Sequence, residues 1–562
     1  MKRVKNITKN LIYMVLIVMS FTSCEDFLNR PTEDNYTVDN FYKTDEQCFQ
    51  AVNPVYNSPW YDFQRGFFKI GEVLSGNYYW GSSPYLTFTI NSTDEDLVNM
   101  SASLWSVNAY CNGIIENIDM KAGKNVSDAT KTTVKGEALV WKAMTYFYLV
   151  RTFGAVPIIH NNSAEIASKN YNNIYKATIP DVYKYIIMTL EKAIEWLPAK
   201  NQPGRIDKYS AYGLLAKVYL TKSGYGVSGS RNADDLAKAA EYAKKVIDES
   251  GRSLLPVYSD IFRLKNNFSE ESLLAWHWVV SNNWTSQNTL QSDLGIIGFD
   301  EYGATWGGYN GPSVDLQQAF GENALKLTRN NIDIRRKATM MMYGDKYDYF
   351  WVDKGGFDYN EFAVKGMEYQ SATGANEVKH LVGNDNDHKI GSGTSMARMA
   401  TSLSTHLLRL ADVYLIYAEA VIGNNGSTSD ASALKAFNAV RGRSVQGYEP
   451  KTSITWEDVW KERRLELACE GDRWYDYIRW HYYEPAKAIA ELKAQKRSTY
   501  IGLNDYYKSG TLNQSSTYYD TNATIPNITD AHFQLPFPDT DLTMNPNLLK
   551  DPVEFDFSTI HY

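Results

Sequence analysis

The chain has 562 residues, of which 44% are hydrophobic and 22% are charged, and its mean hydropathy is -0.42. This composition fits a folded globular body and excludes both a polytopic membrane protein and a disordered chain. The formal net charge of -8 gives an acidic protein that repels nucleic acid and anionic lipid headgroups, so we expect no nucleic-acid partner and only a covalent attachment to a membrane.

The first 23 residues have the pattern of a secretory signal. Basic residues at positions 2, 3, 5 and 9 precede an apolar run at 11–19, which is too short to span a bilayer, and the next small or polar residues lead to Cys24. This ending resembles a bacterial lipobox, with Phe21 in place of the usual Leu. We expect removal of residues 1–23 and acylation of Cys24. Two or more acyl chains on this residue would hold the protein stably on a membrane, because each buried methylene contributes about 0.8 kcal/mol to binding. The alternative is an ordinary signal peptide followed by an incidental cysteine.

The other cysteines predict neither a disulfide framework nor a zinc site. Cys48, Cys111 and Cys469 are odd in number and widely separated. We expect them to be buried as small hydrophobic residues.

Apolar residues at helical spacing predict a scaffold of paired helices at about 130–250 and 405–480. The small residues at 211–216 favour close packing of a tetratricopeptide-like pair. In the last predicted helix, Thr455 and Asp458 form a capping box. The predicted helices cover 138–154, 180–197, 209–219, 233–247, 407–422, 431–440 and 455–470.

Residues 260–400 are rich in Gly, Asn, Tyr and Trp and show little periodicity. We expect long ordered loops there. Loops of this length in a compact body are usually functional, so this region is the predicted ligand-binding half.

Several sequence motifs together resemble the SusD/RagB family, the surface lipoproteins that partner TonB-dependent transporters in Bacteroidetes. The most specific motif joins ERRLEL at 462–467 to EGDRWYD at 470–476. The terminus differs from the family pattern, with Lys550-Asp551-Pro552 in place of Gln-Asn-Pro. The other motifs are CEDFL at 24–28, NFYKT at 40–44, AMTYFYLVRTFGAVP at 143–157, YSAYGLLAKVYL at 209–220, NAVRGR at 438–443, LPFP at 535–538 and NPNL at 545–548.

The resemblance implies a mostly α fold in which residues 24–562 form a single SusD-like domain. Its tetratricopeptide-type helix pairs would pack on a SusC-like TonB-dependent outer-membrane transporter, and its irregular half would present a ligand site. Glu25 and Asp26 resemble the acidic tag that sends such lipoproteins to the outer face of the outer membrane. Hydrolysis is not implied.

Three acids at helical spacing, Glu462, Glu466 and Glu470, nevertheless raise the possibility of glycoside hydrolysis, which paired carboxylates perform. A general acid needs a raised pKa, whereas the intervening Arg463, Arg464 and Arg473 would keep these acids ionised. We therefore interpret the acids as part of a structural ion-pair network and predict no catalytic residue.

Other motifs for catalysis or cofactor binding are missing from the sequence. The eight histidines show no metal-ligand spacing, and Gly391-Ser392-Gly393-Thr394-Ser395 lacks the order of a nucleophile elbow. We expect no metal site and no cofactor, although the sequence leaves calcium binding open.

Rings in the irregular segments are better candidates for binding. The chain has 41 Tyr and 14 Trp, whose ring faces can stack on the C–H faces of sugars while neighbouring amides and acids meet the hydroxyls. Trp141, Trp196, Trp276, Trp278, Trp456 and Trp460 lie in helical or strand patterns and are predicted to be structural, while Tyr347, Tyr349, Phe350 and Trp351 suit either role. The candidate ligand-binding residues, predicted to lie on exposed loops, are Asn77, Tyr79, Trp80, Trp284, Tyr302, Trp306 and Tyr309.

The sequence therefore predicts a lipid-anchored protein on the exterior of the outer membrane that captures a glycan and delivers it to a TonB-dependent transporter. Two alternatives remain open. One is a secreted helical glycoside hydrolase, and the other is a peptide-capturing member of the same family. The sequence does not name the sugar, its linkage or its length.

Overall fold

The structure is a computed structural model that describes residues 41–364, 371–522 and 526–562. The predicted signal segment and Cys24 lie outside these ranges. Within them, no helix combines the length and apolarity needed to cross a bilayer.

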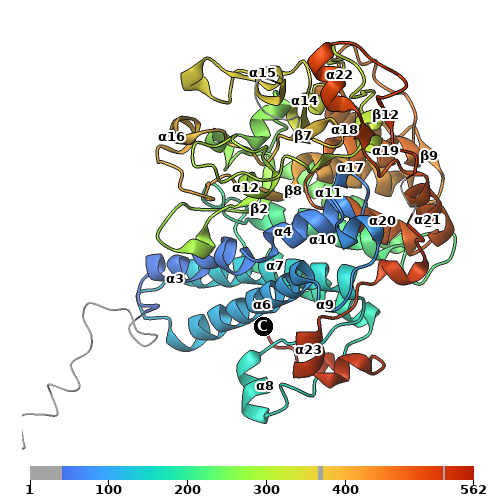
Figure 1. Cartoon of the computed structure of the whole chain (residues 1–562). Coiled ribbons are helices and arrows are strands. Elements are labelled where there is room, and N and C mark those ends of the chain that lie inside the picture. The colour runs from blue at the N-terminus through green and yellow to red at the C-terminus, as the bar shows by residue number, and fades with distance from the viewer. Residues whose placement is uncertain (1–40, 365–370, 523–525) are drawn as a thin grey trace, which may run out of the picture.

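Long helices form one half of the molecule; the first of them lie in the lower part of Figure 1, and the last lie above these, towards the upper right. Each packs against the next in sequence, and the last of the series packs against a later helix pair. This sequential pairing confirms the predicted tetratricopeptide-like scaffold. The series is α6 (Glu95–Lys121), α7 (Asp128–Phe153), α9 (Ile179–Trp196), α10 (Lys208–Lys222) and α11 (Ala233–Glu249), followed by α17 (Leu410–Ile422) and α18 (Ala431–Ser444).

Side-chain caps explain where these helices begin. The side chain of Ser127 accepts a hydrogen bond from the Thr130 amide at the start of α7, and Asp207 forms a capping box with Ser210 at the start of α10. The predicted capping box of Thr455 and Asp458 is confirmed at the start of α19 (Trp456–Glu466). That helix ends at Glu466, four residues earlier than predicted, because the chain turns at Cys469, whose φ is +64°.

The irregular half, at the upper left of Figure 1, contains short elements, most of them where the sequence predicted long loops. Its strands pair in antiparallel twos: β1 (Tyr78–Tyr79) with β3 (Gly311–Pro312), β2 (Ser272–Trp276) with β8 (Thr405–Arg409), β4 (Met340–Met342) with β7 (Ala375–Glu377), and β5 (Lys346–Tyr347) with β6 (Phe357–Asp358). Its helices are α12 (Leu290–Leu294), α13 (Val314–Ala319), α14 (Arg335–Thr339), α15 (Tyr359–Val364) and α16 (Asp385–Ser392). Residues 272–276 form a strand, in agreement with the pattern of Trp276, whereas residues 405–409 form a strand where the helix predicted at 407–422 was expected to begin.

This half has a hydrophobic cluster of its own. Tyr347 and Phe350, for which the sequence left the role open, are buried in it with Phe299 and Phe357. They are therefore structural, and the irregular backbone is held by a packed core.

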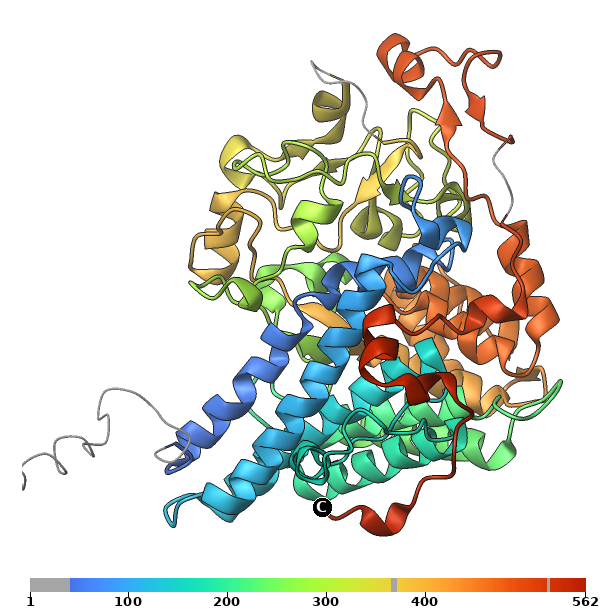
Figure 2. The ribbon, with the colours of Figure 1, turned by 60° about the horizontal axis from the view of Figure 1, so that its bottom comes forward.

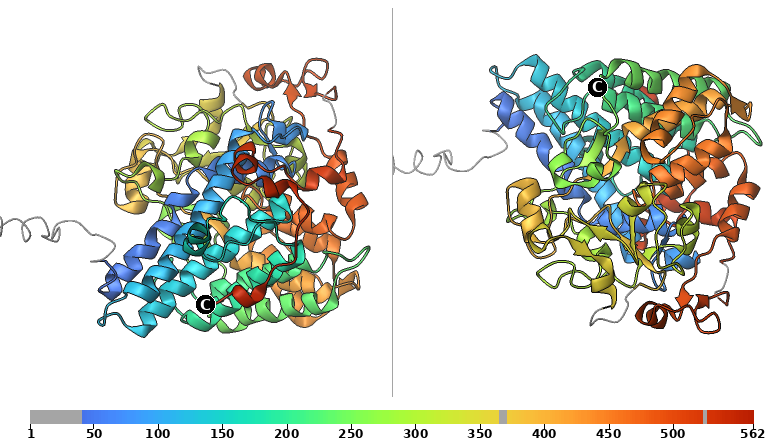
Figure 3. Two further views of the ribbon diagram at one scale, coloured as in Figure 1. Left: turned by 90° about the horizontal axis from the view of Figure 1, so that it is seen from below. Right: turned by 90° about the horizontal axis from the view of Figure 1, so that it is seen from above.

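The remaining elements are spread along the chain. Figure 2 shows the hairpin of β11 (Tyr500–Ile501) and β12 (Tyr518–Tyr519), with α22 (Leu503–Ser509), projecting from the body. In Figure 3 the long helices and the irregular segments occupy opposite sides of the view from above. Other elements are α3 (Asp45–Val52), α4 (Phe63–Phe68), α5 (Pro84–Thr87), α8 (Asn162–Ser168), α20 (Arg473–His481), α21 (Pro485–Ala494), α23 (Asp539–Met544), β9 (Ser427–Thr428) and β10 (Ile454–Thr455).

A large hydrophobic core joins the helical half to the first irregular segments. The rings of Trp60 and Trp141 lie 5.4 Å apart between centroids, and those of Trp60 and Trp276 lie 5.2 Å apart. Trp278 and Trp460 are also buried, so the predicted structural role is confirmed for four of the six tryptophans of helix and strand patterns. The other two, Trp196 and Trp456, are partly buried and pack against the core. Cys48, Cys111 and Cys469 are buried free thiols, as predicted.

Candidate functional site

The platform of the candidate site is the outer side of α4 and the π-helical turn that continues it, Lys69–Val73. Phe63, Phe67 and Phe68 face the core. Tyr61, Arg65 and Lys69 recur every four residues and remain half-exposed, so they form one stripe on the surface. The sequence analysis did not single out this stripe, although its spacing is a signal that could have revealed it.

Trp306 is held beside this stripe by a loop that folds back on α12. Its backbone amide donates to the Ser292 carbonyl at 3.0 Å, and its ring Nε1 donates to Asp293 Oδ1 at 3.0 Å. Gly307 makes this close approach possible, because a Cβ there would lie 2.3 Å from the Asp293 carbonyl oxygen. The Trp306 side chain is fixed in direction but 46% exposed.

Asp293 connects Trp306 electrostatically to the α4 stripe. Burial raises the pKa of Asp293, while the Trp306 N–H and the positive charge of Arg65 oppose that rise. Arg65 and Lys69 in turn contact the buried Asp96, at 2.6 and 2.5 Å. This arrangement places cationic and anionic groups next to the exposed ring.

Trp80 follows strand β1, and its ring lies next to Lys69. The Lys69 Nζ is 4.9 Å from the centroid of the Trp80 ring, which packs partly against Phe68 and Tyr78. The Lys69 ammonium and the packing against Phe68 and Tyr78 fix the Trp80 ring, and part of this ring remains in contact with solvent.

Trp284 completes the surface. It begins the short 3-10 helix Trp284–Ser286, which Asn283 caps by accepting a hydrogen bond from the Thr285 amide. The ring is 52% exposed and lies 6.4 Å from Tyr61 between centroids. Trp80, Trp284 and Trp306 are thus brought together around the α4 stripe, and we call these three residues with Tyr61, Arg65 and Lys69 the tryptophan surface.

Tyr79 and Tyr309 form a second ring pair next to Trp80. Their centroids are 6.0 Å apart, and the pairing of β1 with β3 brings their segments together. Tyr309 is 57% exposed, so the pair extends the ring-bearing surface.

Two predicted residues have different surroundings. Asn77 is fully buried, and its side chain donates to Glu72 and accepts from Arg464, so the prediction that it lies on an exposed loop is wrong. Tyr302 is exposed, but its hydroxyl contacts the Met396 carbonyl at 3.4 Å and it lies near the α16 acid Asp385. Its described contacts therefore do not connect it to the tryptophan surface.

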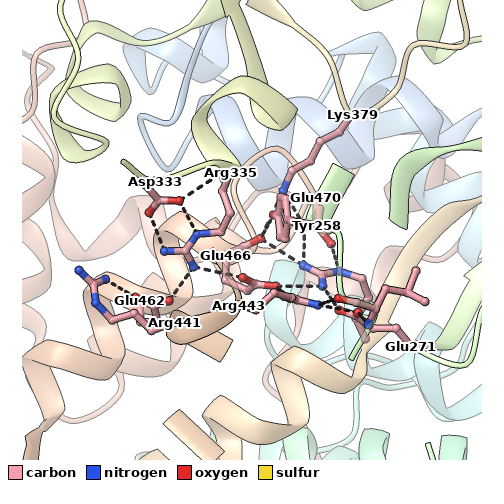
Figure 4. Close-up of polar contacts among 12 residues, drawn as sticks. Tyr258, Glu271, Asp333, Arg335, Lys379, Arg441, Arg443, Glu462, Glu466 and Glu470 are labelled. Carbon is pink, nitrogen blue, oxygen red and sulfur yellow. Dashed lines mark hydrogen bonds and ion pairs between the residues drawn. The ribbon is translucent and has the colours of Figure 1, made fainter. Parts of the chain in front are cut away.

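Glu462 and Glu466 of the ERRLEL motif, together with Glu470, lie in a buried ion-pair network (Figure 4). Glu466 contacts Arg335, Arg409 and Arg443, while Glu470 contacts Arg409 and Lys379. The predicted network is confirmed, but its cations come from other segments. Of the three arginines predicted, Arg463 pairs with Asp412 and Asp476 instead.

The electrostatics of these acids do not suit a general acid. Burial alone would raise the pKa of Glu470, but Arg409 and Lys379 outweigh it and lower that pKa to about 2. Arg443, Arg409 and Arg335 likewise outweigh burial and lower the pKa of Glu466. Both groups stay ionised and inaccessible. Among the residues described, no group of three or more His, Cys, Asp or Glu side chains is arranged to hold a metal ion.

The scaffold of helix pairs with an irregular, ring-bearing half is the fold of SusD-like proteins. Comparison of the sequence assigns the chain to the SusD family, because residues 264–553 match the model of that family. Residues 8–220 also match a family described as starch-binding and associating with the outer membrane.

Individual relatives agree with this assignment. A SusD-like protein of Bacteroides ovatus is 34% identical over 566 residues, which cover 98% of each chain, and SusD-like protein P2 of Formosa agariphila is 26% identical over 84% of this chain and 90% of its own. A crystal structure with a xylogluco-oligosaccharide is 32% identical, with a TM-score of 0.79 and coverage of 91% and 99%. A laminarin-binding SusD-like protein, 21% identical with a TM-score of 0.64, shares the fold over 90% of this chain and 98% of its own.

Proposed function

We propose that this protein is a non-catalytic glycan-binding lipoprotein that captures its ligand on the tryptophan surface. The observation that carries this proposal is the convergence of Trp80, Trp284 and Trp306 around one polar stripe. Flat rings can bury the apolar C–H faces of sugars, while Arg65, Lys69 and their acids can meet the hydroxyl groups. An open surface of this kind suits an extended chain of sugars.

The first glycans to test as ligands are xyloglucans, which are β-glucans with xylose branches. A structural relative that is 32% identical was solved with a xylogluco-oligosaccharide. We expect calorimetry with xyloglucan fragments, run beside laminarin and starch fragments, to detect binding to at least one glycan. Peptide capture would replace this proposal if an array carrying glycans and peptides returned only peptides.

The tryptophans provide the decisive variants. Trp306→Ala and Trp284→Ala each remove a half-exposed ring, so we expect each to weaken glycan binding by about 1 to 3 kcal/mol with little loss of stability. Tyr110→Ala is the matched control, since Tyr110 is a 53% exposed ring on α6. Equal affinity in the Trp306 and Trp284 variants and in the unaltered protein would contradict the assignment.

The cellular part of the proposal is an anchor at Cys24 that holds the protein on the outer face of the outer membrane, from which it delivers glycan to a SusC-like TonB-dependent transporter. The match to a family associated with the outer membrane supports the location. We expect Cys24→Ala to abolish incorporation of labelled fatty acid, and co-purification from membranes should recover the transporter. Appearance of new reducing ends in a mixture of glycan and pure protein would instead favour a hydrolase.

A further inference from the structure

A cavity lies between the loop that joins α9 to α10 and the segment that leads into β2. Its volume is about 440 Å³. Gln202, Gly204, Arg252, Phe268 and His277 are among the residues that line it. A cavity of this size holds one or two sugar rings and is within the range of small-molecule sites.

Phe268 presents a fixed aromatic face in this cavity. The φ of Gly204 is +82°, and a Cβ there would lie 2.4 Å from Phe268 Cδ1, so the ring rests directly on the glycine backbone. The His277 ring lies 5.0 Å from Phe268 between centroids, at an interplanar angle of 67°. His277 is fixed in turn by a 2.8 Å contact between its Nε2 and the Gly204 carbonyl. With one side supported in this way, Phe268 remains 56% exposed.

Three charged residues of the cavity wall are paired, and the other two, Lys200 and Glu270, are exposed and opposite in sign. Arg205 contacts Glu137 at 2.8 Å, and Arg252 contacts Asp207 at 2.7 Å. The protein around the half-exposed His277 desolvates its imidazole and lowers its pKa to about 4, so the ring is neutral at pH 7. The wall therefore offers hydrogen-bonding groups around a ring face without a strong preference for an ion, which suits a neutral, hydroxyl-rich ligand.

The cavity and the tryptophan surface are connected by partly or fully exposed residues. Asn57, Ser58, Tyr61 and His277 are half-exposed, and Asn283 is exposed. The contacts run in a row from one ring to the other: Trp284 with Tyr61, Asn283 Nδ2 with Ser58 Oγ at 3.3 Å, Asn57 Nδ2 with the His277 carbonyl at 2.9 Å, and His277 with Phe268. A glycan that leaves the tryptophan surface past Trp284 meets this row.

We infer that the Phe268 cavity is a second subsite, which holds a neutral sugar ring of a long glycan whose other part occupies the tryptophan surface. This inference rests on the proposed function and adds to it a dependence on chain length. Short fragments would reach only the tryptophans, whereas polymeric chains would reach both places and dissociate more slowly.

The test compares short fragments and polymer of xyloglucan, or of whichever polysaccharide the screen returns, on Phe268→Ala, Trp306→Ala and the Tyr110→Ala control. We expect Phe268→Ala to lower the affinity for polymer by about three- to tenfold, because ring contact area is lost, and to leave the affinity for short fragments unchanged. Phe268→Tyr keeps a flat ring and should restore polymer binding, whereas Phe268→Leu should not. Trp306→Ala should weaken binding of both lengths.

The possible failures can be distinguished. Unchanged polymer affinity in Phe268→Ala, together with a loss in Trp306→Ala, would overturn the subsite and leave the proposed function standing. Unchanged glycan affinity in Trp306→Ala would overturn the binding role of the tryptophan surface. Absence of any glycan binding by the unaltered protein would overturn both that role and the Phe268 subsite. Crystals soaked with long fragments should show sugar density against Phe268.

Discussion

Arg464 donates a hydrogen bond from its Nε to Asn77 Oδ1 at 2.8 Å, and its Nη2 contacts Asp315 at 2.8 Å. Asn77 directly precedes β1, and Asp315 lies in α13, three residues after β3. One guanidinium of α19 therefore fixes the ends of the two strands that lead to Tyr79, Trp80 and Tyr309. This contact gives the ERRLEL motif a physical role, because it joins the scaffold to the ring-bearing segments.

We predict that Arg464→Met lowers the free energy of unfolding by about 1 to 3 kcal/mol, because it leaves the buried Asn77 and the partly buried Asp315 without their partner. Glycan affinity should fall as well, since β1 and β3 lose a common support. Chemical denaturation and calorimetry measure the two effects. Lys461→Ala, at an exposed position one turn earlier in α19, is the control and should change neither.

Sequence patterns predicted the scaffold well where apolar spacing was regular, as in α9 and α11. They missed α6, because several buried positions on this helix are polar, among them Ser101, Asn108 and Asn112, and dilute the apolar pattern. The end of α19 was misplaced for a different reason. The positive φ of Cys469 is imposed by tertiary structure and has no local signal.

The candidate rings were visible in the sequence one by one, but their convergence was not. Trp284 and Trp306 lie more than two hundred residues after Trp80, and contacts of Tyr61, Lys69 and Asp293 bring the three rings together. Asn77 failed as a candidate because burial also depends on such distant contacts, here with Arg464. Local composition indicated which segments carry ligand-type rings, while folding decides which of them share a surface.

A second prediction concerns the support of Trp306. Asp293→Ala removes the acceptor of the Trp306 Nε1–H and should lower glycan affinity by about three- to tenfold, since a freed ring must be ordered again on binding. Asp293→Asn keeps an amide oxygen in the same place and should bind nearly as well as the unaltered protein. Equal losses in both variants, measured by calorimetry, would mean that the negative charge matters more than the hydrogen bond.

Glu377 makes a third prediction, on the pH dependence of stability. Burial raises the pKa of this β7 carboxyl to about 8, from an ordinary value of 4.5. Between these two values the folded protein binds a proton that the unfolded chain has released, so stability falls as pH rises through this window, by up to about 1.4 kcal/mol per pH unit. Above pH 8 this contribution no longer changes.

Glu377→Gln should remove that slope because its amide does not titrate. We expect the variant to gain stability over the unaltered protein as pH rises from 5 to 8, when denaturant midpoints are compared at each pH. Taking the difference between the two proteins cancels other titrating groups, including Lys142, whose pKa burial lowers to about 7. Parallel pH profiles would show that Glu377 is ionised in the folded state.

The fourth prediction separates buried from exposed members of the ion-pair network in Figure 4. Arg409 is 1% exposed and contacts Glu271, Glu466 and Glu470, so Arg409→Met leaves buried carboxylates without compensation and should cost about 3 to 5 kcal/mol of unfolding free energy. Arg441 contacts Glu462 from a side chain that is 30% exposed, and Arg441→Ala should cost about 1 kcal/mol or less.

Similar losses in the two variants, measured by chemical denaturation at neutral pH, would contradict this distinction. The comparison also bears on the role of Glu462, Glu466 and Glu470, the acids of this network that could have suggested catalysis. Suppose that Arg441→Ala has the stability and glycan affinity of the unaltered protein, and that Arg409→Met is less stable. The acids then act by holding α19 to β8 and to the segment of Glu271. Their contribution to binding is then indirect, through the position of the scaffold that carries the tryptophan surface.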